Sequence, residues 1–194
     1  MTSSAPFWRG DPRQFIDDLF VWYQEVGASH YDEQVTQLAH ALQTADHARQ
    51  NGATDIEIGA ALLHDVGHFL VREHSEQGDF LHRDLQHEII GAAWLMQFFP
   101  AELVQLVRLH VPAKRWLCAM DQEYWNGLSD ASKRSLEVQG GPMQPDEIAA
   151  FEAQQGWQAA VALRKYDDWG KQRDSNAPDL ESYRELLLEL LTAA

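Results

Sequence analysis

The sequence predicts an all-α protein folded as a single domain. Apolar residues recur at helical spacing along nearly the whole chain, and almost no stretch alternates apolar and polar residues as a strand does. A chain of 194 residues is long enough to bury roughly 70% of the surface that its unfolded form exposes. No internal repeat, low-complexity tract or linker divides it. We therefore expect one domain of packed helices over residues 1–194.

The apolar periodicity places each helix in turn. Helices are expected over residues 12–26, 33–50, 54–69, 83–98, 101–110, 145–171 and 179–192. Gly52, Pro100, Pro112 and the stretch GGPMQPDE at 140–147 supply breaks between them. The polar segment GKQRDSNAPDLE at 170–181 is expected to connect the last two helices.

Composition excludes several kinds of site and partner. The chain has 15 Lys and Arg against 30 Asp and Glu, a formal charge of −15, which argues against nucleic acid or an anionic membrane as partner. The single cysteine, Cys118, excludes an internal disulfide, and the absence of a CxxC pair excludes a thiolate zinc site. The longest apolar stretch, at 89–96, is too short to cross a bilayer, and the N-terminus lacks the apolar region of a signal peptide. We expect a cytoplasmic protein with a small-molecule partner; the oligomeric state stays open.

Three titratable side chains interrupt the apolar stretch ALLHDVGHFL at 61–70. Burying such groups without partners costs about 2–7 kcal/mol each. On a helix His64 and His68 lie on nearly the same face with Asp65 beside them, so the three can converge on one point. Taken alone, the motif fits core histidines satisfied by backbone carbonyls as well as it fits a metal site. The other helices decide between the two.

The helix over 33–50 carries a second group of candidates. Its apolar stripe is opposed by mostly neutral, hydrogen-bonding residues, with His40 at the centre and Glu33 two turns before it. Because a solvated face is usually rich in charged residues, this one predicts the wall of a polar cavity. Further along, His87 and His110 stand in apolar contexts that favour burial, although each alone also fits a satisfied core or helix-end histidine.

Asp167, in LRKYDDWGK on the helix over 145–171, is either a sixth ligand or the ion-pair partner of Lys171 one turn later. Four imidazoles and two carboxylates suit iron, manganese or zinc, and they do not suit copper(I) or iron–sulfur clusters. With one carboxylate bridging, six ligands hold two metal ions more naturally than one. The sequence therefore predicts a dinuclear metal site within a helical bundle.

These histidines and aspartates resemble the H…HD…D signature of the HD-domain superfamily, a bundle of helices around a metal site, and the additional His87 and His110 resemble its dinuclear branch. Longer stretches are similar to the mixed-valent diiron oxygenases, the group of 2-amino-1-hydroxyethylphosphonate dioxygenase. These stretches are VTQLAHALQTA at 35–45, LLHDVGH at 62–68, HVPAKRWL at 110–117 and SLEVQGGPM at 135–143. The similarity spans about residues 30–171.

The resemblance implies a ligand set, a cofactor and a reaction. The implied ligands are His40, His64, Asp65, His87, His110 and Asp167. Asp65 would bridge two iron ions in the Fe(II)/Fe(III) state, because a carboxylate has two oxygens to share. The implied substrate is a 1-hydroxy-2-aminoethylphosphonate-type compound with a free or N-methylated amine, which O2 cleaves at its carbon–phosphorus bond to an amino acid and phosphate.

The resemblance also implies contacts to the phosphonate end of the substrate. His68 and Lys114 match positions that contact substrate, and Arg115 adds positive charge beside Lys114 in an otherwise acidic protein. Pro112 is expected to end the helix over 101–110, so that the Lys114 side chain is redirected over the open face of the site.

Contacts to the amine end are implied in the segment HYDEQ at 30–34. Glu33 matches an acid that would meet a substrate ammonium. Either His30 or Tyr31 falls at the position of a family tyrosine just before this acid. The acidic, aromatic pair Tyr31 and Asp32 would suit a trimethylammonium group.

Two other functions stay open at this point. An HD phosphohydrolase acting on a nucleotide or another phosphomonoester through a metal-bound hydroxide would use similar ligands. His68 stands where many such hydrolases carry Lys, which favours the oxygenase. A non-enzymatic binding or regulatory module is the third alternative, and it is weakened because no ligand position is lost.

Overall fold

The computed structural model describes residues 4–29, 35–71 and 85–192, and over these ranges the chain forms helices and connecting turns without a β-strand. The predicted all-α fold is therefore confirmed. The helices are α1 (Pro12–Val26), α2 (Gln37–Gln50), α3 (Asp55–Leu63), α4 (Val66–Val71), α5 (His87–Leu95), α6 (Ala101–Met120), α7 (Gln122–Gly127), α8 (Asp130–Val138), α9 (Pro145–Glu152), α10 (Trp157–Trp169) and α11 (Arg184–Leu190), with a 3-10 turn at Leu180–Tyr183. None of the described helices is both long and apolar enough to span a membrane.

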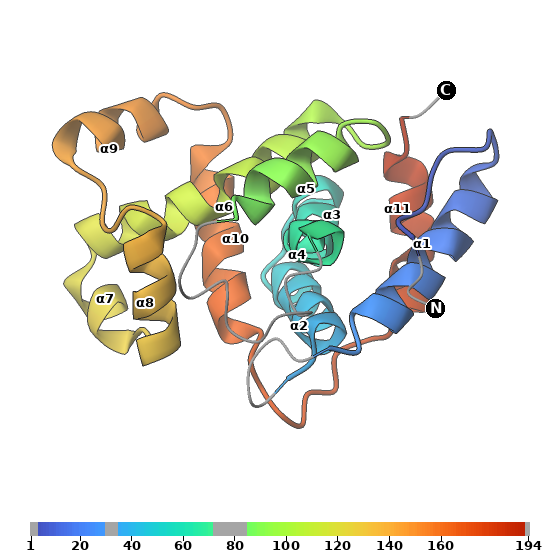
Figure 1. Ribbon diagram of the computed structural model, residues 1–194, viewed down its shortest axis with the longest axis horizontal. Helices are drawn as coiled ribbons and strands as arrows, with labels where there is room; N and C mark the ends of the chain where they lie inside the picture. Colours follow the sequence, from blue (N-terminus) through green and yellow to red (C-terminus); the bar gives the residue numbers. More distant parts are fainter. Residues whose placement is uncertain (1–3, 30–34, 72–84, 193–194) are drawn as a thin grey trace.

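The centre of the molecule is a group of helices packed around α6. Helix α10 packs against α6 and α2, α3 packs against α2 and α6, and α5 packs between α4 and α6. Helices α1 and α11 lie together at one end of the molecule, and α7, α8 and α9 lie at the other end (Figure 1). Side chains that reach the centre therefore come from segments far apart in the sequence.

Several helices begin where the sequence provides a cap. Asp11 accepts hydrogen bonds from the backbone N–H groups of residues 13 and 14 at the start of α1, which begins and ends as predicted. Thr36 caps α2, and Thr54 forms a capping box with Glu57 at the start of α3. These local bonds satisfy N–H groups that the first helical turn leaves without partners.

Two predicted helices are each divided in two. The helix expected over 54–69 breaks at His64 and Asp65, so that α4 is free to turn against α5. The helix expected over 145–171 breaks between α9 and α10, where Gly156 has a φ of +80°, a left-handed conformation that glycine adopts without strain. The last predicted helix, over 179–192, is the 3-10 turn followed by α11.

The prediction that Pro112 ends a helix at residue 110 is wrong, because α6 continues to Met120. Proline removes one backbone N–H and frees the carbonyl of the residue four positions earlier. That residue is Arg108, which is exposed, so solvent can satisfy the freed carbonyl on this side of α6. The helix therefore continues through the proline without ending.

Helices α7 and α8 fill a stretch in which no helix is predicted. They pack on the C-terminal part of α6 through a small apolar cluster of Cys118, Leu128 and Leu136, separate from the main core. Cys118 is a buried free cysteine, as its neighbours indicate. This cluster holds α7 and α8 beside the C-terminal part of α6.

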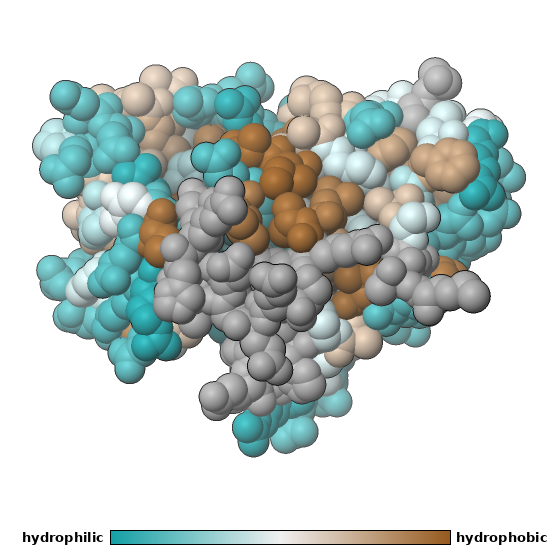
Figure 2. All heavy atoms as spheres, viewed as in Figure 1, coloured by the Kyte–Doolittle hydropathy of each residue, from teal (hydrophilic) through white to brown (hydrophobic). Residues whose placement is uncertain are grey.

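Close backbone contact joins α4 to α5. A Cβ atom on Gly67 would lie 1.9 Å from the carbonyl oxygen of His87, and one on Gly91 would lie 3.1 Å from the backbone nitrogen of Gly67. Apolar residues also gather on the outer surface of α5 (Figure 2), where Ile89 and Ile90 are exposed. The apolar stretch at 89–96 thus has one buried face and one exposed face.

Candidate metal centre

Six buried histidine and aspartate side chains meet where the central helices cross. They are His40 on α2, His64 and Asp65 at the turn between α3 and α4, His87 on α5, His110 on α6 and Asp167 on α10. None is more than 7% exposed. The structure thus brings together all six residues that the sequence predicts as metal ligands.

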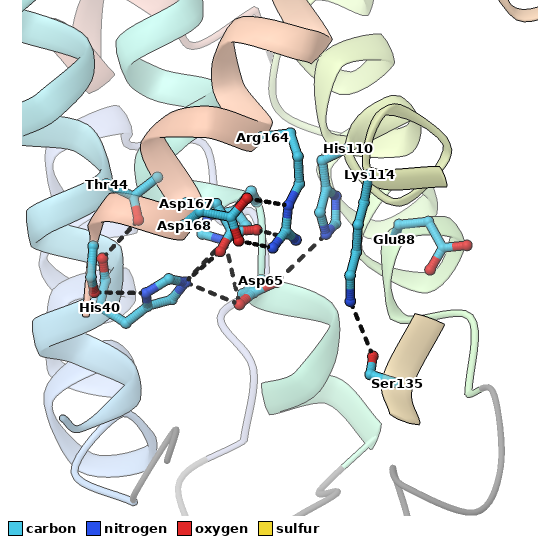
Figure 3. A network of polar contacts seen from close by, with 12 residues as sticks. His40, Thr44, Asp65, Glu88, His110, Lys114, Ser135, Arg164, Asp167 and Asp168 are labelled. Carbon is cyan, nitrogen blue, oxygen red and sulfur yellow. Dashed lines mark hydrogen bonds and ion pairs between the residues drawn. The ribbon is translucent and has the colours of Figure 1, made fainter. Parts of the chain in front are cut away.

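The Asp65 carboxylate lies between two pairs of histidines, of which Figure 3 labels His40 and His110. Its Oδ2 atom is 3.5 Å from Nε2 of His40 and 3.3 Å from Nε2 of His64. Its Oδ1 atom is 3.5 Å from Nε2 of His87 and 3.6 Å from Nε2 of His110. Each oxygen of one carboxylate therefore faces a different pair of imidazoles, which is the arrangement that a bridging ligand needs.

This carboxylate divides the site into two halves. The Asp167 half contains His40, His64 and Asp167, whose Oδ1 atom lies 3.4 Å from Nε2 of His40. The His87 half contains His87 and His110, whose Nε2 atoms are 3.0 Å apart. Each half gathers nitrogen and oxygen donors of the kind that intermediate metal ions prefer.

Backbone carbonyls orient three of the four imidazoles. The carbonyl oxygens lie close to Nδ1 of the rings: Gly170 for His40 (2.9 Å), Ala61 for His64 (2.9 Å) and Val107 for His110 (2.6 Å). Because a carbonyl only accepts hydrogen bonds, Nδ1 donates the proton and the Nε2 lone pair is left facing the centre. Metal-binding histidines are commonly held in this way.

The Asp167 half has more hydrogen-bond acceptors than donors. The Nε2 atoms of His40 and His64 are 3.3 Å apart, and with their Nδ1 protons donated to carbonyls both are acceptors. The Oδ1 atom of Asp167 is buried and has no hydrogen-bond partner among the described residues. Buried acceptors that face each other need a cation between them. The residues present therefore fit a bound metal ion.

Carboxylates set the charge of this half. Burial lowers the pKa of His40, but the carboxylates of Asp167 and Asp65, 3.4 Å and 3.5 Å from its Nε2 atom, outweigh burial and raise the pKa from 6.5 to about 9. Burial opposes ionisation of Asp65, but the charges of His64 and His68 hold the pKa of this carboxyl well below its usual range. The Asp167 half therefore attracts positive charge, whether a proton or a metal ion.

The His87 half has the opposite character. Burial lowers the pKa of His87 well below its ordinary value, and burial also lowers the pKa of His110 from 6.5 to about 4. Both imidazoles are thus neutral near pH 7, which is the form that binds a metal ion.

His68, predicted to contact substrate, lies at the edge of the His87 half. Its ring stacks on that of His87, with centroids 3.8 Å apart, and its Nε2 atom is 3.7 Å from Oδ1 of Asp65. Asp65, His68 and His87 are close enough to hold one ion, as are His40, His64 and Asp65. The break between α3 and α4 gives His68 this place, so it does not share a continuous helix with His64 as predicted.

Arg164, which the sequence analysis did not single out, holds the second aspartate of the site. Its Nη1 atom donates to Oδ2 of Asp167 over 2.6 Å, and its other nitrogens contact Asp168 and Tyr124. The alternative partner considered for Asp167, Lys171, instead lies 3.5 Å from Asp168. The run RKYDD contains the signal for this pairing, since residues three and four apart are neighbours on a helix.

Lys114 is a buried cation one turn after His110 on α6. Its Nζ atom lies 3.5 Å from the hydroxyl oxygen of Ser135 on α8 (Figure 3). Burial and the nearby charge of Arg164 lower the pKa of Lys114 to about 7. The position of Lys114 follows from regular helix geometry, and the predicted redirection by Pro112 does not occur.

The other predicted substrate contacts have different outcomes. Arg115 donates to Glu147 Oε1 (2.7 Å) and to the carbonyl of Gly141 (2.9 Å), and so it ties α6 to the segment around α9. The predicted contacts Tyr31, Asp32 and Glu33, together with His30, lie outside the described residues. Ser135 was not predicted as a site residue, because no helix was predicted in its segment that would place it beside α6.

Comparison with known proteins agrees with this geometry. The HD domain family model matches residues 34–141. A hydroxymethylphosphonate dioxygenase from Gimesia maris is 50% identical over 172 residues, which cover 89% of this chain and 86% of the relative. A 1-hydroxy-2-(trimethylamino)ethylphosphonate dioxygenase (glycine-betaine-forming) from Leisingera caerulea is 44% identical over 175 residues, 88% of this chain and 86% of the relative. An uncharacterized protein of Acanthamoeba polyphaga mimivirus is 31% identical over 181 residues, 92% of this chain and 83% of the relative.

The chain belongs to the HD-domain family, whose model matches more than half of its length. Within this family it falls in the group that contains these two phosphonate dioxygenases, because its similarity to both extends over most of each protein. The resemblance seen in the sequence is thereby confirmed.

Proposed function

We propose that this protein is a non-haem diiron oxygenase that uses O2 to cleave the carbon–phosphorus bond of a 1-hydroxyphosphonate and releases phosphate. The observation that carries this proposal is the placement of Asp65, whose two oxygens face separate pairs of histidines. The names of the relatives from Gimesia maris and Leisingera caerulea support the substrate class and the use of O2.

The proposed ligands divide between the two halves of the site. His40, His64 and Asp167 would hold one iron, and His87 and His110 would hold the other. Asp65 would bridge the two. When bound, the iron pair supplies chelation of the substrate and one-electron chemistry towards O2.

Lys114 is proposed to hold the phosphonate. It lies one turn after His110 on the same side of α6, so its ammonium can reach an anion held at the His87 half. Burial costs a charged Lys114 free energy, and a phosphonate oxygen beside Nζ restores the charged form because opposite charges attract strongly in a buried site. The Ser135 hydroxyl beside Nζ adds a second donor.

His68 is proposed to contact the substrate from the edge of the site. It is less buried than the proposed ligands, and its stacking on His87 fixes the plane of its ring. A donor held in this way can fix the position of the substrate hydroxyl or phosphonate relative to the centre.

The proposed reaction balances without an external reductant. The C1–H and C–P bonds break, C1 becomes a carboxylic acid and phosphorus leaves as phosphate. The two oxygen atoms that the products gain are those of one O2 molecule, and the four electrons that reduce O2 come from the substrate. The protein residues need only bind, orient and exclude water.

The substituent on C1 is the finer part of the proposal. The predicted amine, free or N-methylated, is supported by the name of the Leisingera caerulea relative, whereas the substrate named for the Gimesia maris relative has no amine. The substrates in these two names share the 1-hydroxyphosphonate unit. We propose that the centre and Lys114 recognise this unit, and that segment 30–34 selects the substituent.

The test is a substrate panel after anaerobic loading with Fe(II). Hydroxymethylphosphonate, 1-hydroxy-2-aminoethylphosphonate and its trimethylated form are incubated with and without O2, and phosphate and the carboxylic acid are measured. We expect equal amounts of both products, and only with O2. Phosphate released without O2, from these compounds or from a phosphomonoester, would instead identify a phosphohydrolase.

A further inference from the structure

Behind Asp167 lies a buried ion-pair network that metal binding by Asp167 does not itself require. Its centre is the guanidinium of Arg164, of which only 6% of the side chain is exposed. Asp168 and Tyr124 contact this guanidinium through nitrogens other than the one that contacts Asp167 (Figure 3 shows Arg164, Asp167 and Asp168). The question is what this network does for the site.

Asp168 accepts hydrogen bonds from two nitrogens of Arg164. Nε donates to Oδ2 of Asp168 over 3.1 Å, and Nη2 donates to Oδ1. This paired contact between a planar guanidinium and a carboxylate is the strongest geometry available to arginine. It leaves Nη1 as the nitrogen that contacts Asp167, over 2.6 Å to Oδ2.

Tyr124 of α7 fixes the paired contact from the other side. Its hydroxyl donates to Oδ2 of Asp168 over 2.6 Å and accepts from Nε of Arg164 over 3.1 Å. The hydroxyl therefore contacts both partners of the ion pair. Through it, the α7 segment, which lies outside the central helices, contacts the network that ends at Asp167.

The consequence for Asp167 is that only one of its oxygens is engaged by arginine. Its Oδ1 atom stays buried without a hydrogen-bond partner and lies 3.4 Å from Nε2 of His40. A guanidinium without Asp168 would favour a paired contact with the nearest remaining carboxylate, which is Asp167. That contact would engage Oδ1 of Asp167, the oxygen that faces the histidines.

We propose that Asp168 and Tyr124 are positioning residues of the metal centre: they engage Nε and Nη2 of Arg164, so that Arg164 holds Asp167 by one oxygen and leaves the other for a metal ion. This inference rests on the proposed function only in requiring a metal ion at Asp167. It assigns a role to two residues that are not among the proposed metal ligands or substrate contacts.

The experiment measures Fe(II) affinity of the full chain under anaerobic conditions, by competition with a coloured chelator. Asp168→Asn removes the charge and one acceptor while keeping the size of the side chain. We expect it to weaken binding of one of the two irons by about 10–100-fold, the effect typical of losing a residue that orients a metal ligand. Equal affinity in Asp168→Asn and in the unmodified protein overturns the proposal.

A double variant separates positioning from general support of the fold. In Arg164→Met/Asp168→Asn no guanidinium is left to capture Asp167, so we expect iron affinity to recover relative to Asp168→Asn. A residue with a merely structural role would give the opposite result, because removing both partners would damage the site further. A double variant that binds iron as weakly as the single variant therefore overturns the proposal.

Glu147→Gln is the matched control, because it breaks another arginine–carboxylate pair, with Arg115, and should leave iron affinity unchanged. Circular dichroism of the metal-free proteins reports folding. If Asp168→Asn does not fold, Tyr124→Phe is measured in its place. We expect Tyr124→Phe to bind iron more weakly than the unmodified protein, with a smaller loss than that expected for Asp168→Asn. Equal iron affinity in Tyr124→Phe and the unmodified protein overturns the proposal. An unmodified protein that binds two irons but releases no phosphate would refute the proposed function and leave this test valid.

Discussion

The two halves of the centre share Asp65 but are supported in different ways. In the Asp167 half, a second carboxylate faces the histidines and is itself held by buried Arg164. In the His87 half, the Nε2 atoms of the two imidazoles face the shared carboxylate, the ring of His68 stacks on that of His87, and Oε2 of Glu88 lies 3.7 Å from Nδ1 of His87. The pKa values follow this difference, about 9 for His40 in the first half and about 4 for His110 in the second.

This difference indicates separate tasks for the two halves. Two carboxylates at the Asp167 half stabilise a more highly charged ion, since attraction grows with charge in a buried site. The His87 half lies beside His68, which is proposed to contact the substrate, and His110 of this half is one helical turn from Lys114. We infer that one half mainly retains metal and the other mainly receives substrate.

The largest expected effect comes from removing the residue that the halves share. Asp65→Ala should lose both irons and all phosphate release, because each oxygen of Asp65 faces one pair of histidines. His68→Ala should keep both irons and lose substrate affinity. Iron content after desalting is the measurement. An Asp65→Ala protein that retains one iron would show that the halves are independent.

The next effect should appear in substrate binding alone. Lys114→Ala should keep a normal iron content and weaken substrate binding by about 2–5 kcal/mol, the range for removing one partner of a buried charged pair. Iron stoichiometry and the substrate-induced change in the mixed-valent EPR signal are the measurements. Unchanged substrate affinity, or loss of iron, would place the phosphonate contact elsewhere.

Substitution of two glycines that pack against the site should affect the two halves differently. A Cβ on Gly67 would lie 1.9 Å from the backbone oxygen of His87, so Gly67→Ala should destabilise the metal-free fold by about 1–3 kcal/mol or more. A Cβ on Gly170 would lie 2.6 Å from Oγ1 of Thr44 and 3.2 Å from both Nδ1 and the backbone oxygen of His40, so the overlap with backbone atoms is smaller than at Gly67. Gly170→Ala should therefore cost less stability and mainly weaken iron binding. Thermal melting and iron titration measure both, and equal loss of stability in the two variants would contradict this order.

The smallest effect concerns pH in the metal-free protein. The raised pKa of His40 stabilises the fold fully below pH 6.5, and this contribution is lost as the pH rises through about 9. The lowered pKa of His110 acts on the acid side, where stability falls as the pH drops from 6.5 towards about 4. We expect the melting temperature to decline on both sides, with the alkaline decline absent once iron replaces the proton on His40. An alkaline decline that persists with iron bound would contradict this assignment.

Much of the site could be predicted because its residues break a local pattern. His64, Asp65 and His87 are polar residues in apolar stretches, and His40 lies in the middle of a face that has too few charges to be solvated. Such residues need partners when buried, whatever the fold. The same reasoning could not find Tyr124, which looks like an ordinary surface residue until the helices are packed. The spacing of Arg164 and Asp168 indicates that they can pair, but only the packing shows that the pair is buried beside the site.

The sequence alone determined that the protein is helical, that it is acidic, and that its buried histidines and aspartates need a metal-like partner, since periodicity, charge and the cost of burying polar groups are local properties. The tertiary structure decided how these residues are arranged around the two halves of the site. It placed the two oxygens of Asp65 towards different histidine pairs. It continued α6 past Pro112, so that Lys114 lies one turn after His110 on the same helix. It also placed Ser135 of α8 beside Lys114 and Tyr124 of α7 beside Asp168. These outcomes depend on contacts between distant segments, which form only when the helices pack.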